Sequence, residues 1–217
     1  ITNHPGEFNA SATDADATKI QQAAQEVVAH HAQDPNYRGV TYSAFLASGV
    51  HPMSRALTSA GIPHATFTGE MQQKDRKQMV QDYNTGKIKH LLISGAGAEG
   101  LDLKGTKLMQ ILEPHWNEEL INQVKGRAIR YHSHSHLPSD ERHVEIQRFH
   151  AIPQKTMVDR MLGRPRSSLK SADEYIYETA QEKRKLNQPF LQALEGTEAG
   201  KAASLFCSWG AWEVTDG

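Results

Sequence analysis

Short apolar runs alternate with amphipathic stretches along the first two thirds of the chain. Five runs are strongly apolar or rich in β-branched and aromatic residues, and they cover residues 39–45, 63–67, 90–94, 107–113 and 143–149. Runs of this length with little internal alternation are typical of strands that are covered on both faces. Strands that alternate with helices predict a doubly wound parallel α/β sheet with flanking helices.

Helices are expected between these strands and after the last one. Apolar residues at helical spacing predict helices over residues 15–33 and 72–85, and Pro52 indicates the start of another over 53–60. Near the end of the chain, Ser171 and Glu174 have the spacing of a capping box, which predicts a long helix that begins there. A proline at position 189 is expected to kink or interrupt that helix.

The length of 217 residues suits one α/β core with an appendage. We expect a linker and helix over 1–36, the α/β domain over 37–152, a basic segment with a helical extension over 153–195, and a tail over 196–217. The chain begins at Ile1, which suggests a piece of a longer protein.

Composition restricts the partners and the compartment. The net charge is −1, so no global field favours nucleic acid and any basic surface must be local. A single cysteine, Cys207, excludes an internal disulfide and disfavours a cysteine-based zinc site. No apolar run approaches the roughly 20 residues of a membrane span. We therefore expect a cytoplasmic protein that has no membrane partner.

A glycine-rich stretch offers a dinucleotide-binding interpretation. Residues 95–100 read G-x-G-x-x-G after a predicted strand, and Glu113 ends the next one. A Rossmann unit needs a helix of several turns directly after the glycines, and residues 101–106 are too few to form it. A Rossmann oxidoreductase that binds NAD(H) therefore stays a disfavoured alternative.

A stripe of polar residues on the helix predicted after the strand at 107–113 indicates an anion-binding site. Gln123, Arg127 and Arg130 lie at i, i+4 and i+7, so two guanidinium groups share one face. Like charges this close repel each other, so the arrangement makes most sense opposite a phosphate.

Four motifs in order carry a resemblance to a known family. The pattern from Ser94 to Gly100-Leu101-Asp102, followed by Gln123-x-x-Gly126-Arg127-x-x-Arg130, resembles motifs V and VI of superfamily 2 helicases and translocases. Upstream, TYSAF (41–45) looks like motif IV, and FTGE (67–70) looks like the next nucleic-acid-binding motif. The sequence EPHWN (113–117) is similar to the Swi/Snf-like branch. Residues 121–138, followed by ERHVEI (141–146) and by 171–186, resemble the helicase-like NTPases of large DNA viruses, of the type of the poxvirus early transcription factor small subunit and nucleoside triphosphatase I.

The resemblance implies a RecA-like domain and assigns roles to its matching residues. The implied catalytic residues are Arg127 and Arg130 as arginine fingers, with Gln123 beside them. The implied ATP-binding residues are Gly100, Asp102 and Gly126. The implied nucleic-acid-binding residues are Ser43, Phe45, Thr68, Gly69, Ser94 and Gly95. The implied nucleic acid is DNA, contacted through its backbone, in a bacterial, phage or viral context.

The sequence departs from a complete motor in one respect. It holds neither a G-x-x-x-x-G-K-[ST] loop nor a DExx box after a strand, so the phosphate cradle and the Mg²⁺-binding acid are expected on an N-terminal RecA-like domain. The isolated chain is therefore not expected to hydrolyse ATP. The alternative from another class is a degenerate RecA-like module that binds a protein partner.

Alternating histidines at 132, 134 and 136 offer a metal site, which we disfavour. No acids stand at obvious positions to orient these imidazoles. No metal ligand is assigned in this sequence.

Overall fold

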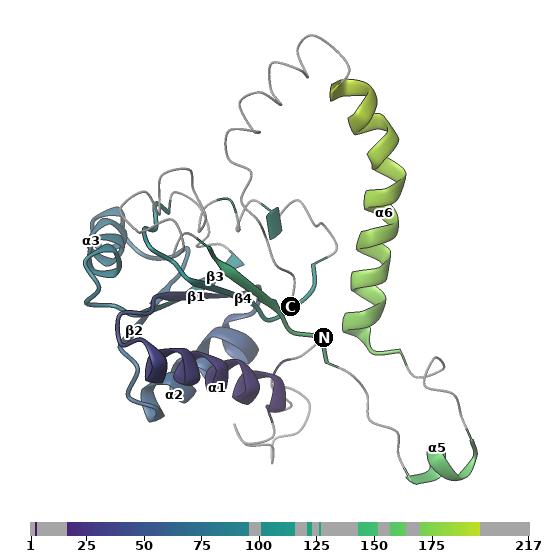
Figure 1. The fold of residues 1–217 in the computed structure, drawn as a ribbon, viewed down its shortest axis with the longest axis horizontal. Helices are drawn as coiled ribbons and strands as arrows, with labels where there is room; N and C mark the ends of the chain where they lie inside the picture. The colour runs from purple at the N-terminus through teal and green to yellow at the C-terminus, as the bar shows by residue number, and fades with distance from the viewer. Residues whose placement is uncertain are drawn as a thin grey trace.

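The computed structural model describes residues 3, 17–95, 101–115, 121–122, 126, 143–151, 157–163 and 170–195. Its centre is a sheet of parallel strands in the order β2-β3-β1-β4-β5 (Figure 1). The strands are β1 (Gly39–Ser43), β2 (His64–Phe67), β3 (His90–Ser94), β4 (Leu108–Ile111) and β5 (Glu145–Arg148). The predicted parallel sheet is confirmed, and each strand lies within a predicted apolar run.

The register aligns the carboxyl ends of the strands at one edge. Ser43 at the end of β1 is the partner of Ser94 at the end of β3, and Ile111 of β4 is the partner of Arg148 at the end of β5. Phe67, the last residue of β2, is the partner of Ile93. Loops that leave these strands therefore begin side by side, as ligand-binding loops do in open α/β sheets.

Helices cover both faces of the sheet. These are α1 (Thr18–Gln33), α2 (His51–Ser59) and α3 (Gln73–Asn84), with a π-helical turn, η3 (Leu46–Val50), directly before α2. Two further helices, α5 (Met157–Met161) and α6 (Ala172–Glu195), follow β5 in the chain. The helical path after β1 therefore begins earlier than expected, and Pro52 lies in the first turn of α2, where a missing N–H costs little.

Alternate strand residues supply two apolar cores. Towards α3, Val40, Tyr42, Leu91, Ile93, Met109 and Ile111 pack with Tyr83. Towards α1 and α2, Leu92 and Leu108 pack with Ile20, Val27, Met53 and Leu57. Figure 1 shows α3 on one side of the sheet and the α1–α2 pair on the other. This burial on both faces explains why the central strands β1, β3 and β4 are buried along their whole length and largely apolar.

A row of polar side chains crosses the sheet beneath α1. The Thr41 hydroxyl lies 2.7 Å from His90 Nε2 and donates to Gln110 Oε1 at 2.9 Å. The Gln110 amide donates in turn to the Ala23 carbonyl at 2.9 Å and to Gln147 at 3.0 Å. The row satisfies groups that would otherwise be buried without partners.

The long helix α6 is docked at its beginning. The capping box is confirmed, because the Ser171 N–H donates to Glu174 at 2.9 Å and the Glu174 N–H donates to Ser171 Oγ at 3.0 Å. Ile176 is buried, whereas Leu186 is 79% exposed. The sequence predicts a kink or an interruption at Pro189. The helix continues across Pro189, so an interruption there is wrong.

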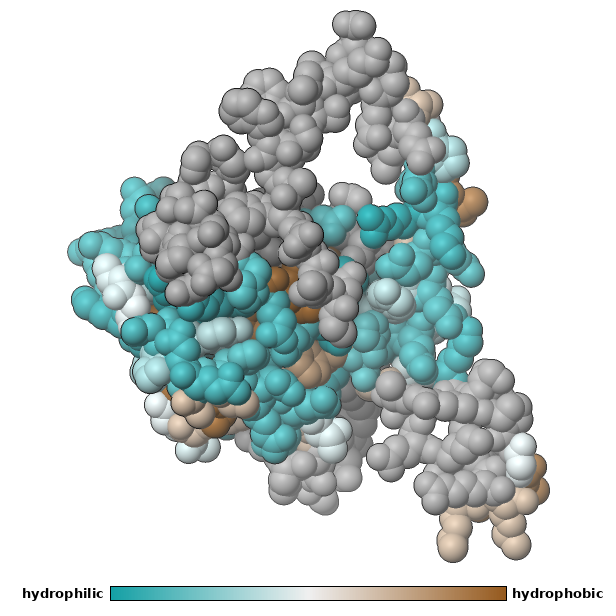
Figure 2. All heavy atoms as spheres, viewed as in Figure 1, coloured by the Kyte–Doolittle hydropathy of each residue, from teal (hydrophilic) through white to brown (hydrophobic). Residues whose placement is uncertain are grey.

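Exposed apolar side chains gather on α5. Met157, Val158 and Met161 of α5 and Leu162 directly after it are all exposed, and Figure 2 shows tan and brown atoms at this end of the molecule. Figure 1 shows that α5 stands away from the sheet. Within the described parts of the chain, no helix combines the length and the apolar character needed to cross a bilayer.

Candidate nucleic-acid and nucleotide interface

A buried carboxylate joins the ends of β1 and β4. Glu113 is 4% exposed, and its Oε1 accepts a hydrogen bond from the Ser43 hydroxyl at 2.6 Å. Its Oε2 accepts from the backbone N–H of Ala44 at 2.9 Å, and the side-chain amide of Asn3 also donates to it. Burial raises the pKa of Glu113, and the hydrogen bonds oppose that rise. The carboxylate thus fixes the turn that leaves β1.

The π-helical turn η3 packs against this carboxylate through Gly49. A Cβ at Gly49 would lie 1.9 Å from Ser43 Oγ and 3.1 Å from Glu113 Oε1, so only glycine fits without movement. The Val50 N–H donates to the Phe45 carbonyl at 3.0 Å, which closes the wide turn. The candidate motif IV is therefore a rigid loop built on a buried acid.

Four predicted nucleic-acid-binding residues lie at the ends of β1 and β3. Ser43 and Ser94 are register partners, and both are buried. Phe45 is 38% exposed, and Gly95 is also exposed. A Cβ at Gly95 would lie 3.8 Å from Ala44 Cα, which places the two loops in contact. The solvent-facing groups of this set are thus the Phe45 ring and the backbone at Gly95.

The other two predicted residues, Thr68 and Gly69, lie on the loop after β2, and Arg76 of α3 holds that loop. Arg76 Nε donates to the Met71 carbonyl at 3.0 Å, and Nη2 donates to the carbonyls of Thr68 at 3.3 Å and Gly69 at 2.6 Å. Its Cζ lies 5.4 Å from the centre of the Phe67 ring. The guanidinium donates from two of its nitrogens, held in one plane, so its hydrogen bonds reach carbonyls that lie too far apart for the single nitrogen of an ammonium to reach in the same geometry.

The segment that leads into β4 alternates between the core and the surface. Leu101 and Leu103 are buried in the α3-side core, whereas Asp102 is exposed between them. At the end of the segment, Gly105 has φ +67°, and a Cβ there would lie 2.1 Å from Arg38 Nη2. Asp102, the predicted ATP-binding acid, is therefore exposed on a segment whose neighbouring leucines are anchored in the core.

The remaining predicted site residues fall largely outside the described residues. These are Gln123, Arg127 and Arg130 of the predicted motif VI, and Gly100 of motif V. Gly126 is described as helical and exposed, which agrees with a helix at motif VI. The histidines at 132, 134 and 136 also lie outside the described residues. In the described ranges, no group of three or more His, Cys, Asp or Glu side chains could hold a metal ion.

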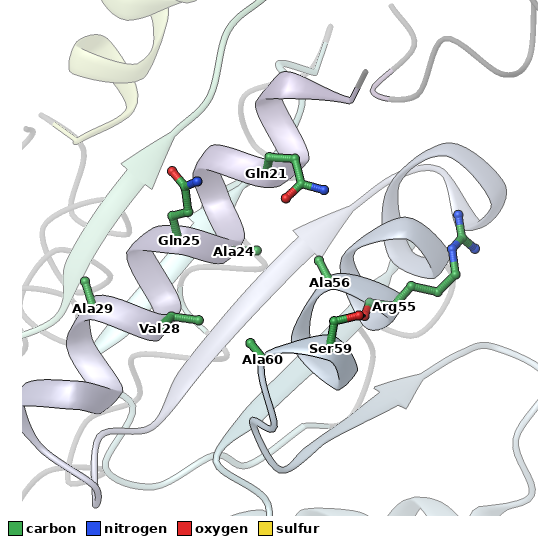
Figure 3. Close-up of a pocket in the computed structure, with 9 residues that line it drawn as sticks. All are labelled: Gln21, Ala24, Gln25, Val28, Ala29, Arg55, Ala56, Ser59 and Ala60. Atoms are coloured by element: carbon green, nitrogen blue, oxygen red, sulfur yellow. The ribbon is translucent and has the colours of Figure 1, made fainter. Parts of the chain in front are cut away.

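A separate groove lies between α1 and α2 (Figure 3). It is lined by Gln21, Ala24, Gln25, Val28, Ala29, Arg55, Ala56, Ser59 and Ala60. Small apolar side chains form its floor, and the Arg55 side chain extends away from α1. The groove belongs to the face of the sheet opposite α3, away from the loop that Arg76 holds.

These features define a RecA-like α/β domain whose candidate loops leave the carboxyl ends of parallel strands. Residues 19–132 match the model of the helicase conserved C-terminal domain. The chain therefore belongs to the family of helicase C-terminal domains.

Viral proteins are among its relatives. Protein L538 of Acanthamoeba polyphaga mimivirus, whose name describes it as an ATP-dependent RNA helicase, is 47% identical over 116 residues, covering 54% of this chain and 26% of that protein. A termination factor NPH-I homolog of African swine fever virus is 35% identical over 170 residues, covering 72% of this chain and 24% of that protein. Nucleoside triphosphatase I of Choristoneura biennis entomopoxvirus is 33% identical over 87 residues, covering 39% of this chain and 13% of that protein. The chain thus spans about a quarter of the length of the first two relatives.

Sequence reasoning missed the residues that support the loops. Glu113 was assigned no supporting role, since it entered only the dinucleotide alternative and the EPHWN resemblance, and Gly49 was assigned no role. An acid directly after an apolar strand was the available signal for Glu113, because a buried carboxylate needs donors and the neighbouring strand ends supply them.

Proposed function

We propose that this chain is the second RecA-like lobe of an ATP-dependent nucleic-acid motor that works with an N-terminal RecA-like lobe. Membership of the helicase C-terminal domain family supports this proposal, because the matched residues 19–132 include all four helicase motifs named above. The observation that carries the proposal is the alignment of the motif loops at the carboxyl ends of β1, β2 and β3. Open α/β sheets bind ligands at that edge.

The nucleic-acid contacts are proposed for the loops on this edge. Phe45 and Gly95 offer a ring and an accessible backbone, and Thr68 and Gly69 offer a hydroxyl and a backbone held by Arg76. Contacts of this kind position a phosphate backbone and do not read bases. Ser43 and Ser94 are also proposed to contact the nucleic-acid backbone, and they lie buried at the strand ends where these loops begin.

ATP binding and hydrolysis are shared between the lobes in this proposal. Arg130 is the arginine finger on the γ-phosphate, with Arg127 and Gln123 beside it, since fixed positive charge stabilises the equatorial oxygens of the transferred phosphoryl group. Asp102, Gly100 and Gly126 contact the nucleotide. The Mg²⁺ ion would be held by the N-terminal lobe, because such motors hold it through a phosphate-binding loop and a DExx-type acid, and this sequence contains neither motif.

The decisive experiment measures ATP turnover by the two-lobed protein with single-stranded DNA, duplex DNA or RNA. Arg130→Ala should lower the stimulated kcat by about 10³ and leave KM for ATP within a few-fold, because the finger acts mainly in the transition state. Arg130→Lys should not restore activity, since an ammonium lacks the planar fork. Arg184→Ala, on the exposed part of α6, is the matched control and should retain activity.

The choice of nucleic acid is part of the same measurement. The name of the mimivirus relative refers to RNA, whereas the motifs resemble those of DNA translocases. Stimulation by one polymer identifies the track. A two-lobed protein that turns over no ATP with any of them contradicts the proposed function and favours the protein-interaction module.

A further inference from the structure

The side chain of Asn84, the last residue of α3, makes two hydrogen bonds to the segment that carries Asp102. Its Nδ2 donates to the Asp102 carbonyl at 3.0 Å, and its Oδ1 accepts from the Lys104 N–H at 2.8 Å. A primary amide presents a donor and an acceptor side by side, so it can pair with backbone as a neighbouring strand does. Both bonds fix the path of the backbone, whatever side chains it carries.

Asn84 is itself held firmly. Its backbone carbonyl accepts from Arg38 Nη1 at 2.9 Å, and the carbonyl of Tyr83 accepts from the same nitrogen at 3.3 Å. The buried Tyr83 hydroxyl lies 2.9 Å from Thr106 Oγ1. The end of α3 therefore contacts the segment twice: Asn84 bonds to residues 102 and 104, and Tyr83 contacts Thr106.

These contacts determine how Asp102 is presented. Leu101 and Leu103 are buried on the inner side, so the segment cannot slide outwards without exposing them. The bond from Asn84 to the Asp102 carbonyl fixes the orientation of that peptide group. The bond from the Lys104 N–H to Asn84 fixes the orientation of the peptide group that joins residues 103 and 104. The Asp102 side chain is thereby directed to the surface.

We infer that Asn84 is a positioning residue for nucleotide binding, which orients Asp102 so that its carboxylate accepts a hydrogen bond from a ribose hydroxyl of ATP. The inference rests on the proposed function. An ionised carboxylate is an acceptor only, and a ribose hydroxyl is a suitable donor. Asn84 acts through the backbone at 102 and 104, and it touches neither the nucleotide nor the transferred phosphate.

The first measurement compares Asn84→Ala with Gln81→Ala in the two-lobed protein. Gln81 is an exposed amide three residues earlier on α3, so it controls for loss of an amide from this helix. Asn84→Ala should raise KM for ATP about tenfold and leave kcat within about twofold, because the ribose is bound but does not react. Asn84→Asp should behave like Asn84→Ala, since a carboxylate cannot donate to the Asp102 carbonyl. Gln81→Ala should match the wild type.

The second measurement is ribose selectivity, which a purely structural role would not alter. Wild type and Gln81→Ala should prefer ATP over 2′-deoxy-ATP or 3′-deoxy-ATP. Asp102→Asn and Asn84→Ala should each lose most of that preference. The double variant should lose no more than Asp102→Asn alone, because both changes remove the same contact.

The outcomes separate the inference from the function on which it rests. A wild-type protein without ATP turnover contradicts the proposed function. An active wild type in which Asn84→Ala lowers the melting temperature, yet keeps full ribose selectivity, overturns the inference and makes Asn84 a helix-end contact only. Hydrogen exchange at the Lys104 amide should be faster in Asn84→Ala than in Gln81→Ala, and unchanged exchange would also count against the positioning role.

Discussion

Lys19 in the first turn of α1 and Asp173 in the first turn of α6 form a buried ion pair, 2.8 Å apart and separated by 154 residues of chain. The two side chains are 8% and 2% exposed. Asp173 also accepts a hydrogen bond from the Ala151 N–H at 2.9 Å. The pair therefore ties the helical extension to the helix that precedes the sheet.

Removal of one partner should be costly. Asp173→Ala or Lys19→Met leaves a buried charge unpaired and should lower the free energy of unfolding by about 3–5 kcal/mol in urea titrations. The double change Lys19→Met with Asp173→Leu should recover a large part of that loss. Glu178→Gln, which breaks the exposed pair with Lys170, is the control and should cost less than about 1 kcal/mol. Equal losses of stability from the Lys19–Asp173 and Lys170–Glu178 pairs would contradict the conclusion that burial makes the first pair costly to break.

The packing of Gly49 against Ser43 predicts a steric effect. Gly49→Ala should lower the free energy of unfolding by about 1–3 kcal/mol, because the new methyl group meets Ser43 Oγ and Glu113. Ser43→Ala in the same chain should relieve part of that loss. Gly126→Ala is the matched control, since a Cβ at that helical glycine would meet nothing within 4 Å. It should be neutral or stabilise by up to about 1 kcal/mol in thermal melts.

His90 should make the fold sensitive to mild acid. Burial lowers the pKa of His90 to about 3, and the neighbouring His31 and His64 add to the effect. Below the ordinary value of 6.5, the unfolded chain binds a proton that the folded chain refuses, so stability falls as pH falls. We expect a loss of about 1.4 kcal/mol between about pH 7.5 and 5.5 from this group. His90→Gln should remove that slope, whereas His51→Gln, at an exposed position, should retain it.

Arg76 should matter for nucleic acid through the loop that it holds. Arg76→Gln should weaken binding of a labelled oligonucleotide by the two-lobed protein by about 3- to 10-fold, because the loop loses the bonds to its carbonyls. Lys77→Gln removes the same charge from the adjacent exposed position and serves as the control. A similar loss in both variants would assign the effect to charge, and Arg76 would then have no positioning role.

The parts of the fold that could be predicted are those set by local pattern. The strands follow from their apolar runs, because a strand covered on both faces is mostly apolar, with buried polar residues only where they find hydrogen-bond partners. The Ser171–Glu174 capping box joins residues three apart, so its sequence spacing was sufficient. The motif pattern also predicted that Ser43, Thr68 and Ser94 lie at the carboxyl ends of strands, and the structure has Ser43 and Ser94 at the ends of β1 and β3 and Thr68 directly after β2.

Other features depend on contacts that local pattern does not contain. The π-helical turn at 46–50 results from the approach of Gly49 to Ser43 and Glu113, and the last two are 70 residues apart. The continuation of α6 across Pro189 shows that an interior proline does not have to end a helix, here in a stretch where the helix is exposed. Asn84 gave no signal, because an asparagine near a helix end is ordinary and its partners at 102 and 104 become neighbours only in the folded chain.

The parallel register also places the turns at the amino ends of the strands on the edge of the sheet opposite to the motif loops, where an insertion should be tolerated. The turn that enters β2 lies at the amino ends of the strands, and it contains Gly61, where φ is +72° and a Cβ would meet nothing within 4 Å. An affinity handle or a fluorophore inserted beside Gly61 would project from the edge opposite to the motif loops. Such a label would leave uncovered the edge of the sheet at which the motif loops begin.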